Sequence, residues 1–208
     1  MINTLTERYP ALDICKGEIK SACEAIIECY RRGGKLLLCG NGGSASDCEH
    51  IVGELMKGFL RCRPLSGEAK AEMKKACPEL DDRLLSSLQA GLPAISLPHV
   101  SALNSAFCND VEPEYIYAQS TLALGKKGDV LIAMSTSGNA KNVLAAARVA
   151  RGLGITVIAL TGRCGGLLRS AADIAICVPE DETYKIQELH LPVYHAICAA
   201  VEAEFFKE

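Results

Sequence analysis

The chain has 208 residues, which fits one domain, and its content of 49% hydrophobic and 23% charged residues is that of a globular protein. The formal net charge of -3 argues against a protein built to wrap nucleic acid, so no nucleic-acid partner is expected. No apolar run approaches the ~20 residues of a membrane span, and the first residues lack a basic and then apolar secretion signal. No membrane partner is expected either.

Eleven cysteines are an unusual number for a chain of this size. They are scattered singly with no C-x-x-C pair, and several, such as Cys39 and Cys177, lie inside apolar runs. A thiol in such a position behaves as a small buried hydrophobe. The pattern predicts reduced core cysteines and a cytoplasmic location rather than a disulfide scaffold or a zinc cluster.

Helical and strand patterns alternate along the chain. Residues 11–31 carry apolar side chains at helical spacing and are followed by Gly33 and Gly34, a natural helix stop. Short apolar runs, partly β-branched, predict strands that are covered on both faces, at residues 35–39, 94–97, 130–134, 156–160 and 174–178. The predicted helices that accompany them span residues 45–60, 101–107, 114–124, 140–153, 164–171 and about 184–206.

This order predicts an α/β fold, with a five-stranded parallel sheet between helices on both faces and ligands bound beyond the carboxyl ends of the strands. Residues 64–91 break the alternation. They are rich in Lys, Glu and Asp and carry helical patterns at 68–77 and 81–90. We expect a helical insertion at the rim of the sheet, as a lid or a subunit contact, with its charges on a solvated face.

The first predicted strand runs into a glycine-rich turn, Gly40-Asn41-Gly42-Gly43-Ser44-Ala45-Ser46, and then into a helix. Glycines allow a ligand to approach the backbone, and the N–H groups at the start of a helix favour an anion. The turn also fits the G-x-G-x-x-A dinucleotide fingerprint, but the second strand ends at Leu97-Pro98-His99 without the carboxylate that would hold a ribose. No nucleotide cofactor is therefore expected.

A second turn follows the third predicted strand. It reads Ser135-Thr136-Ser137-Gly138-Asn139 and precedes a helix. One serine suffices to cap a helix, whereas three hydroxyls beside free N–H groups favour a cradle for the monoester phosphate of a small molecule.

Two predicted helices pair histidine with carboxylate or amide groups. His50 and Glu54 are four residues apart and share one helix face, and the last helix carries Gln187 and His195. A carboxylate base and an imidazole beside a phosphate cradle suit proton transfer next to a carbonyl, as in aldose–ketose isomerisation. The same set suits a divalent metal such as zinc, and the spacing leaves both interpretations open.

The combined pattern resembles the phosphoheptose isomerases of the sugar-isomerase (SIS) domain family. The resemblance rests on the two turns, His50-x-x-x-Glu54, Leu160-Thr161-Gly162 and Ile186-Gln187-Glu188-x-His190-x4-His195. It covers nearly the whole chain apart from residues 64–91. It implies a single SIS domain over residues 1–208 with a flavodoxin-like fold, an N-terminal helical arm at residues 1–33 and assembly as a homotetramer with active sites between subunits. The implied reaction converts sedoheptulose 7-phosphate into an aldose phosphate through an enediol, often with zinc.

The resemblance also implies roles for individual residues. Glu54 would be the base that moves a proton between C1 and C2, and His195 the acid/base that serves the two oxygens. The implied zinc ligands are His50, Glu54, Gln187 and His195. The implied substrate-binding residues are Asn41, Gly42, Gly43, Ser44, Asp110, Ser135, Thr136, Ser137, Asn139 and Gln187, with Ser135, Thr136 and Ser137 on the phosphate.

The chain departs from the family pattern at a few positions. Ala140 replaces a serine that usually follows Ser-Gly-Asn, Lys57-Gly58 replaces Gly-Arg, and Tyr184-Lys185 precedes Ile-Gln-Glu. A non-catalytic SIS module that binds a phosphosugar or a protein partner is the alternative hypothesis. The presence of both Glu54 and His195 speaks against it, because a pure binder needs no matched base and acid.

Overall fold

The computed structural model describes residues 1–206 and contains a sheet of five parallel strands. The strands are β1 (Leu36–Cys39), β2 (Ala94–Ser96), β3 (Val130–Met134), β4 (Thr156–Thr161) and β5 (Ile174–Cys177). Their order across the sheet is β2-β1-β3-β4-β5, which is the flavodoxin-like arrangement. The predicted fold class is confirmed, and each strand lies within one or two residues of its predicted bounds.

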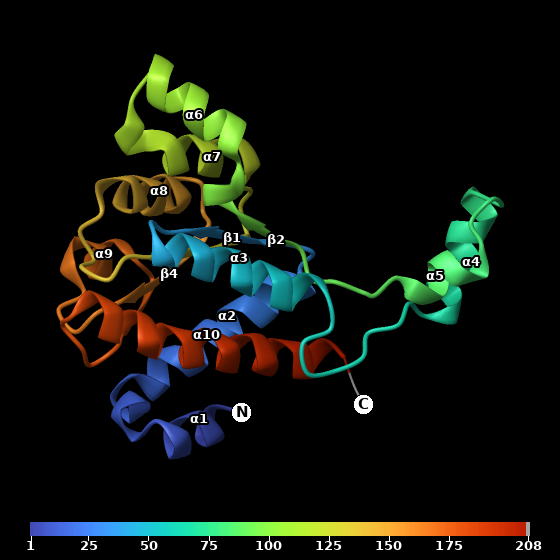
Figure 1. Ribbon diagram of the computed structural model, residues 1–208, viewed down its shortest axis with the longest axis horizontal. Coiled ribbons are helices and arrows are strands. Elements are labelled where there is room, and N and C mark those ends of the chain that lie inside the picture. Colours follow the sequence, from blue (N-terminus) through green and yellow to red (C-terminus); the bar gives the residue numbers. More distant parts are fainter. Residues whose placement is uncertain (207–208) are drawn as a thin grey trace.

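Helices cover both faces of this sheet. In chain order they are α1 (Ile2–Arg8), η1 (Pro10–Cys15), α2 (Lys16–Arg31), α3 (Gly43–Met56), α4 (Gly67–Ala76), α5 (Asp82–Ser87), η2 (Leu97–His99), α6 (Ser101–Asp110), η3 (Pro113–Tyr115), α7 (Ile116–Leu124), α8 (Lys141–Gly152), α9 (Gly166–Ala171) and α10 (Thr183–Phe205). In Figure 1, α2, α3 and α10 lie below the sheet and α7 and α8 above it.

The core has two halves because successive strand residues point to opposite faces. Leu36 and Leu38 of β1 pack with α2, α3 and α10, whereas Leu37 and Cys39 pack with α7 and α8. The continuous apolar runs of the sequence follow from this double coverage.

All eleven cysteines are free, as the sequence predicts. Six are buried, namely Cys15, Cys23, Cys29, Cys39, Cys48 and Cys198, and burial raises the pKa of Cys39 to about 12. Four others are exposed, and Cys177, which the sequence predicts to be buried, is only half-buried because β5 lies at the edge of the sheet. None of the described helices is long and apolar enough to cross a membrane.

The N-terminal region differs from the prediction of one long helix at 11–31. It forms α1, the 3-10 turn η1 and then α2, and Leu5, Leu12 and Ile19 of these three elements are all buried. Helix α1 carries a single buried residue in seven, so it has no amphipathic pattern long enough to detect in the sequence.

Helix α3 also ends earlier than predicted, at Met56 instead of residue 60. Lys57 adopts an extended conformation, and the N–H of Gly58 donates to Oε1 of Gln89 at 2.7 Å. The N–H groups of Phe59 and Leu60 donate to Glu202. Partners from distant parts of the chain therefore replace the helical hydrogen bonds of these residues, and the local sequence does not encode them.

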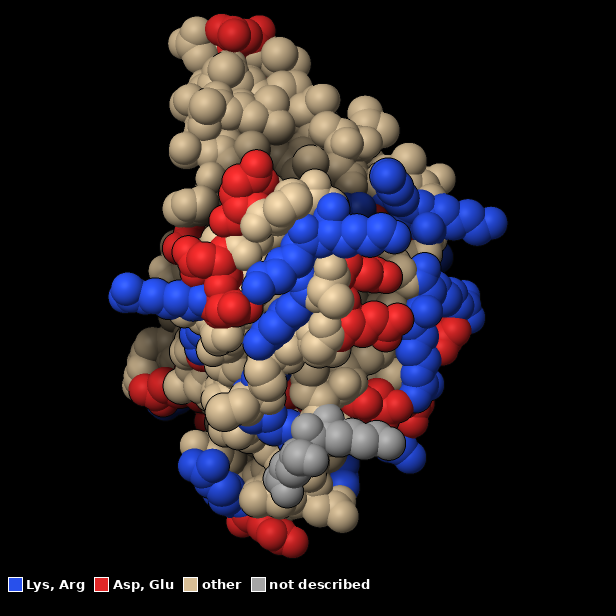
Figure 2. Space-filling model, turned by 90° about the vertical axis from the view of Figure 1, so that its right-hand side faces the viewer, with Lys and Arg blue, Asp and Glu red and all other residues tan. Residues whose placement is uncertain are grey.

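The insertion forms two helices that project from the body of the protein (Figure 1). An isolated antiparallel bridge between Pro64 and Gln89 closes its base. The second helix, α5, ends at Ser87 rather than at the predicted residue 90. Helix α4 has no buried residue. Figure 2 shows Lys and Arg mixed with Asp and Glu on the side from which the insertion projects.

Candidate active site

The predicted site residues form two groups, one at the amino end of α10 and one at the middle of that helix. The first group lies beyond the carboxyl ends of β1 and β3 and can cradle an anion. The second lies between the middle of α3 and the middle of α10 and carries the carboxylate and imidazole groups.

The glycine turn after β1 is shaped by its backbone and by α10. Gly42 has a φ of 55°, a conformation that L side chains rarely adopt. A Cβ at Gly43 would lie 2.5 Å from Nε2 of Gln187. Gly43 therefore has to be glycine for the Gln187 amide to lie against the turn.

Asn41 is held by partners that the sequence did not reveal. Its side-chain amide and that of Asn142 exchange two hydrogen bonds of 2.9 Å, and the hydroxyl of Tyr117 donates to the carbonyl of Gly40 at 2.8 Å. These contacts join α7 and α8 to the glycine turn. Asn142 belongs to an ordinary helical pattern, so no local signal marks it as part of the site.

The turn after β3 is organised by its own hydroxyls. Ser135 Oγ accepts from the N–H of Ala140 at 3.4 Å, and Ser137 Oγ accepts from the N–H of Asn139 at 3.2 Å. Each hydroxyl keeps its proton available for a ligand oxygen. The amino end of α8 begins directly behind them and favours an anion.

The turn after β4 supports this cradle from outside. The N–H of Leu168 donates to the carbonyl of Gly138 at 2.9 Å, and the N–H of Leu167 donates to Oδ1 of Asn139 at 3.1 Å. Asn139 also donates its amide to the carbonyl of Ser137. Its side chain is thus engaged within the loops and does not line the cavity described next.

The two turns enclose a cavity of about 350 Å³. The predicted substrate-binding residues that line it are Asn41, Gly42, Gly43, Ser44, Ser135, Thr136, Ser137 and Gln187. Asp110 does not line it. That carboxylate lies exposed at the end of α6 and accepts a hydrogen bond from Asn109.

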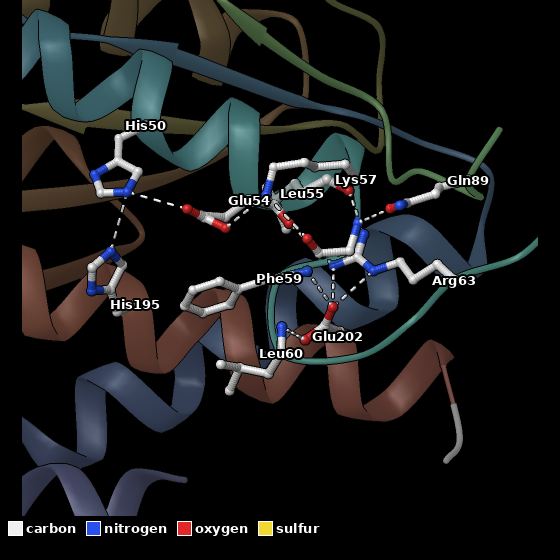
Figure 3. Close-up of polar contacts among 11 residues, drawn as sticks. His50, Glu54, Leu55, Lys57, Phe59, Leu60, Arg63, Gln89, His195 and Glu202 are labelled. Carbon is white, nitrogen blue, oxygen red and sulfur yellow. Dashed lines mark hydrogen bonds and ion pairs between the residues drawn. The ribbon is translucent and has the colours of Figure 1, made fainter. Parts of the chain in front are cut away.

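The second group brings together residues from α3 and α10 (Figure 3). Nε2 of His50 lies 3.2 Å from Oε1 of Glu54 and 3.4 Å from Nε2 of His195. The ring of Phe59 lies beside His195, with centroids 5.5 Å apart. Phe59 and His195 line a different cavity of about 230 Å³, bounded by α1 and α10.

A relay behind His50 fixes its tautomer. The hydroxyl of Tyr194 donates to Oδ1 of Asp47 at 3.2 Å, and Nδ1 of His50 lies 2.9 Å from the same hydroxyl oxygen. Because the carboxylate can only accept, we assign the tyrosine proton to Asp47 and the Nδ1 proton to His50. In the neutral ring, Nε2 of His50 then presents a lone pair to Glu54 and His195.

The electrostatics of the group centre on these acceptors. Burial and the neighbouring His50 lower the pKa of His195, which favours its neutral form. Glu54 is mostly buried, and its Oε2 makes no hydrogen bond within the described residues, although Nζ of Lys57 lies 3.6 Å away. An acceptor-rich site of this kind needs a proton or a cation to satisfy it.

Within the described residues, no three His, Cys, Asp or Glu side chains form a ready metal site. The fourth predicted ligand, Gln187, lies near the amino end of α10 against Gly43. The two separations at His50, 3.2 and 3.4 Å, are nevertheless close to the ligand–ligand spacing of about 3.3 Å around a tetrahedral zinc ion. His50 also has the hydrogen-bonded second ring nitrogen typical of a metal ligand.

Known proteins resemble the chain over most of its length. The SIS domain profile matches residues 11–82 and 84–162. The phosphoheptose isomerase of Roseiflexus sp. is 39% identical over 190 residues, 91% of this chain and 83% of the relative. The phosphoheptose isomerase of Methylibium petroleiphilum is 39% identical over 201 residues, which are 95% of this chain and 88% of the relative.

Solved structures agree with this similarity. The phosphoheptose isomerase of Neisseria gonorrhoeae superposes with a TM-score of 0.76 at 31% identity, covering 94% of this chain and 91% of the other. The phosphoheptose isomerase of Francisella tularensis superposes with a TM-score of 0.75 at 31% identity, covering 96% of this chain and 95% of the other. The chain therefore belongs to the SIS domain family and, within it, to the phosphoheptose isomerases.

Proposed function

We propose that this sugar-phosphate isomerase converts sedoheptulose 7-phosphate, or a closely related ketose phosphate, into the corresponding aldose through an enediol. The observation that carries the proposal is the convergence of the Glu54 carboxylate and two imidazoles, in a chain that also holds a phosphate-sized cradle at the strand ends. The relatives that bear the name phosphoheptose isomerase support the same substrate.

The proposed chemistry needs a balanced movement of two protons. Glu54 removes a proton from C1 of the ketose while His195 supplies one to O2, which gives the enediol. Glu54 then returns its proton to C2, and His195 takes one from O1, which gives the aldehyde. Because the pKa of His195 is lowered, its ring is neutral at neutral pH, and Nδ1, the nitrogen that does not face His50, can give a proton to O2 and take one from O1.

The phosphate group anchors the substrate away from the reacting carbons. Ser135, Thr136 and Ser137 bind it together with the amino end of α8, and no cationic side chain of residues 1–206 lines the cavity. The hydrogen-bonded amide pair of Asn41 and Asn142 holds the first turn in place for the sugar hydroxyls.

Zinc is part of the proposal. His50, Glu54 and His195 would hold it, with Gln187 as a fourth ligand, and the bare Nε2 lone pair of His50 supports this assignment. A bound divalent metal would polarise the substrate carbonyl and stabilise the enediol oxygens.

We also propose that the protein assembles as a homotetramer. Gln187 and His195 are eight residues apart on α10, about 12 Å of helix, and they line different cavities. A homotetramer with active sites between subunits would bring the cradle of one subunit to the acid–base group of another. The free cysteines support a reducing, cytoplasmic location.

The decisive experiment is a panel of ketose and aldose phosphates in D₂O, with and without zinc, followed by NMR. An isomerase forms product and incorporates solvent deuterium at the carbon that is reprotonated. Binding without product or exchange for every sugar would instead support the non-catalytic alternative.

Glu54→Gln tests the role of the base. We expect kcat to fall by about 10²–10⁴-fold, because general-base catalysis is lost, while the circular dichroism spectrum is unchanged. Glu49→Gln is the matched control, since Glu49 lies on the same helix with a half-exposed side chain that pairs with His99. Turnover that survives in Glu54→Gln would rule out this residue as the base.

A further inference from the structure

A fully buried ion pair lies behind the acid–base group. Arg63 follows α3 on the way to the insertion, Glu202 lies near the end of α10, and their side chains are 0% and 1% exposed. The guanidinium contacts the carboxylate through Nη2 at 2.8 Å and Nε at 2.9 Å. Burying two charges is costly unless every polar atom finds a partner, so the contacts of the pair indicate what it does.

Glu202 holds the segment that leaves α3. Its Oε1 accepts from the N–H of Phe59 at 2.8 Å, and its Oε2 accepts from the N–H of Leu60 at 2.8 Å (Figure 3). Burial alone would raise the pKa of Glu202, but these two N–H groups and Arg63 together lower it, so the carboxylate stays charged. The side chain therefore fixes the backbone of Phe59, whose ring lies against His195.

Arg63 holds the end of α3 itself. Its Nη1 donates to the carbonyl of Leu55 at 2.6 Å, and its Nη2 donates to the carbonyl of Glu54 at 3.1 Å. The guanidinium thus caps the carboxyl end of the helix, where a cation is favoured. Its Cζ also lies over the ring of Phe206, 4.5 Å from the ring centre. The backbone of the proposed base is anchored directly by this cap.

We propose that Arg63 and Glu202 are positioning residues of the isomerase, which fix the Glu54 backbone and the Phe59 ring so that the carboxylate and His195 keep their catalytic geometry. The proposal rests on the proposed function of Glu54 and His195. Neither residue faces the phosphate cradle, so the pair acts on the reacting end of the substrate and not on phosphate binding.

Glu202→Gln tests the proposal, because an amide keeps the shape but cannot accept from both N–H groups and from Arg63. We expect kcat to fall about 10- to 100-fold, since small misplacements of catalytic groups have effects of this size, while KM changes less than about threefold. Asp129→Asn is the matched control. Asp129 is also buried and accepts from two N–H groups, of Lys35 and Lys126, and from the Lys35 ammonium, but it lies at the amino end of β3.

If Arg63 and Glu202 only stabilise the fold, Glu202→Gln and Asp129→Asn should both lower stability and both leave kcat of the folded protein unchanged. That result would overturn the proposal. If Glu202→Gln does not fold, Arg63→Met combined with Glu202→Leu removes both buried charges without leaving one unpaired. This double variant should fold and should still show the loss in kcat. Wild-type kcat in the folded double variant would equally overturn the proposal.

A second measurement does not depend on turnover. The ring of Phe59 shifts the NMR resonances of the His195 ring protons, which are assigned among the four histidines with His195→Gln. We expect these resonances to move in Glu202→Gln and to stay in place in Asp129→Asn. If wild-type protein converts no sugar phosphate, the proposed function fails. Resonances that do not move in a folded Glu202→Gln protein would overturn the positioning role by itself.

Discussion

The four histidines of the chain lie in very different surroundings. His50 and His195 face each other, His99 lies exposed beside Glu49, and His190 is fully buried on α10. Neither ring nitrogen of His190 makes a hydrogen bond within the described residues, although the backbone of Thr161 lies nearby. Burial lowers the pKa of His190 to about 4, so the ring is neutral in the folded protein.

This histidine makes stability depend on pH. Its pKa falls from 6.5 in the unfolded chain to about 4 in the folded one, so the unfolded chain binds more protons between these values. Stability is complete above pH 6.5 and is lost as the pH falls through this window. We expect urea unfolding to show that the wild type loses about 3 kcal/mol more between pH 7 and pH 4 than His190→Gln does. The control His99→Gln changes an exposed histidine and should lose as much stability between pH 7 and pH 4 as the wild type does. The same loss in all three proteins would contradict the prediction.

Two adjacent turns act together at the level of elements. The turn after β3 carries the phosphate-binding hydroxyls, and the turn after β4 packs on it so closely that a Cβ at Gly138 would lie 2.0 Å from the carbonyl oxygen of Gly165. Gly138 also has a φ of 66°, which favours glycine. The sequence predicts the turn after β3 as a phosphate cradle. It carries no local signal for the part played by the turn after β4, since that part depends on contacts across two neighbouring strands.

Gly138→Ala should therefore disrupt both stability and phosphate binding. We expect the free energy of unfolding to fall by about 3 kcal/mol, because of backbone strain and overlap with the turn after β4. We also expect KM for the sugar phosphate to rise by a larger factor than kcat falls. Gly17→Ala provides the comparison, since Gly17 lies in α2 and no other described part of the chain, beyond its own helix backbone and its two neighbours, comes within 4 Å of a new Cβ. That variant should be neutral or stabilised by up to about 1 kcal/mol. A Gly138→Ala protein as stable as wild type would show that the turns can separate.

At the scale of the whole molecule, the phosphate cradle and His195 of the acid–base group line different cavities. Asp110 likewise lies exposed at the end of α6, away from both. Helices α4 and α5 project away from the body of the protein (Figure 1). These features are the physical reason for proposing sites shared between subunits.

Subunit mixing tests this proposal. Ser137→Asp should abolish phosphate binding through charge repulsion, and Glu54→Gln should abolish proton transfer, so each variant alone is inactive. Mixed oligomers of the two should regain activity if the cradle and the base of one site come from different subunits, because some sites then carry neither defect. Oligomers shown by sedimentation to be mixed, yet inactive, would place each complete site within one subunit.

The sequence by itself determined the alternating strands and helices, because apolar runs and glycine stops are local signals. It also indicated which side chains could transfer protons and bind phosphate. His50 and Glu54 share a helix face, and the hydroxyls of residues 135–137 directly follow a strand. It could not show that α3 stops at Met56, that Asn142 pairs with Asn41, or that Arg63 and Glu202 hold Glu54 and Phe59 in place.

Those contacts join residues up to 143 positions apart, so no local pattern encodes them. The tertiary structure also decided which histidines meet. His50 and His195 lie together because α3 and α10 pack side by side on one face of the sheet, whereas His190, on the same helix as His195, is fully buried. Local propensity fixes the elements, and the packing of distant elements fixes the site.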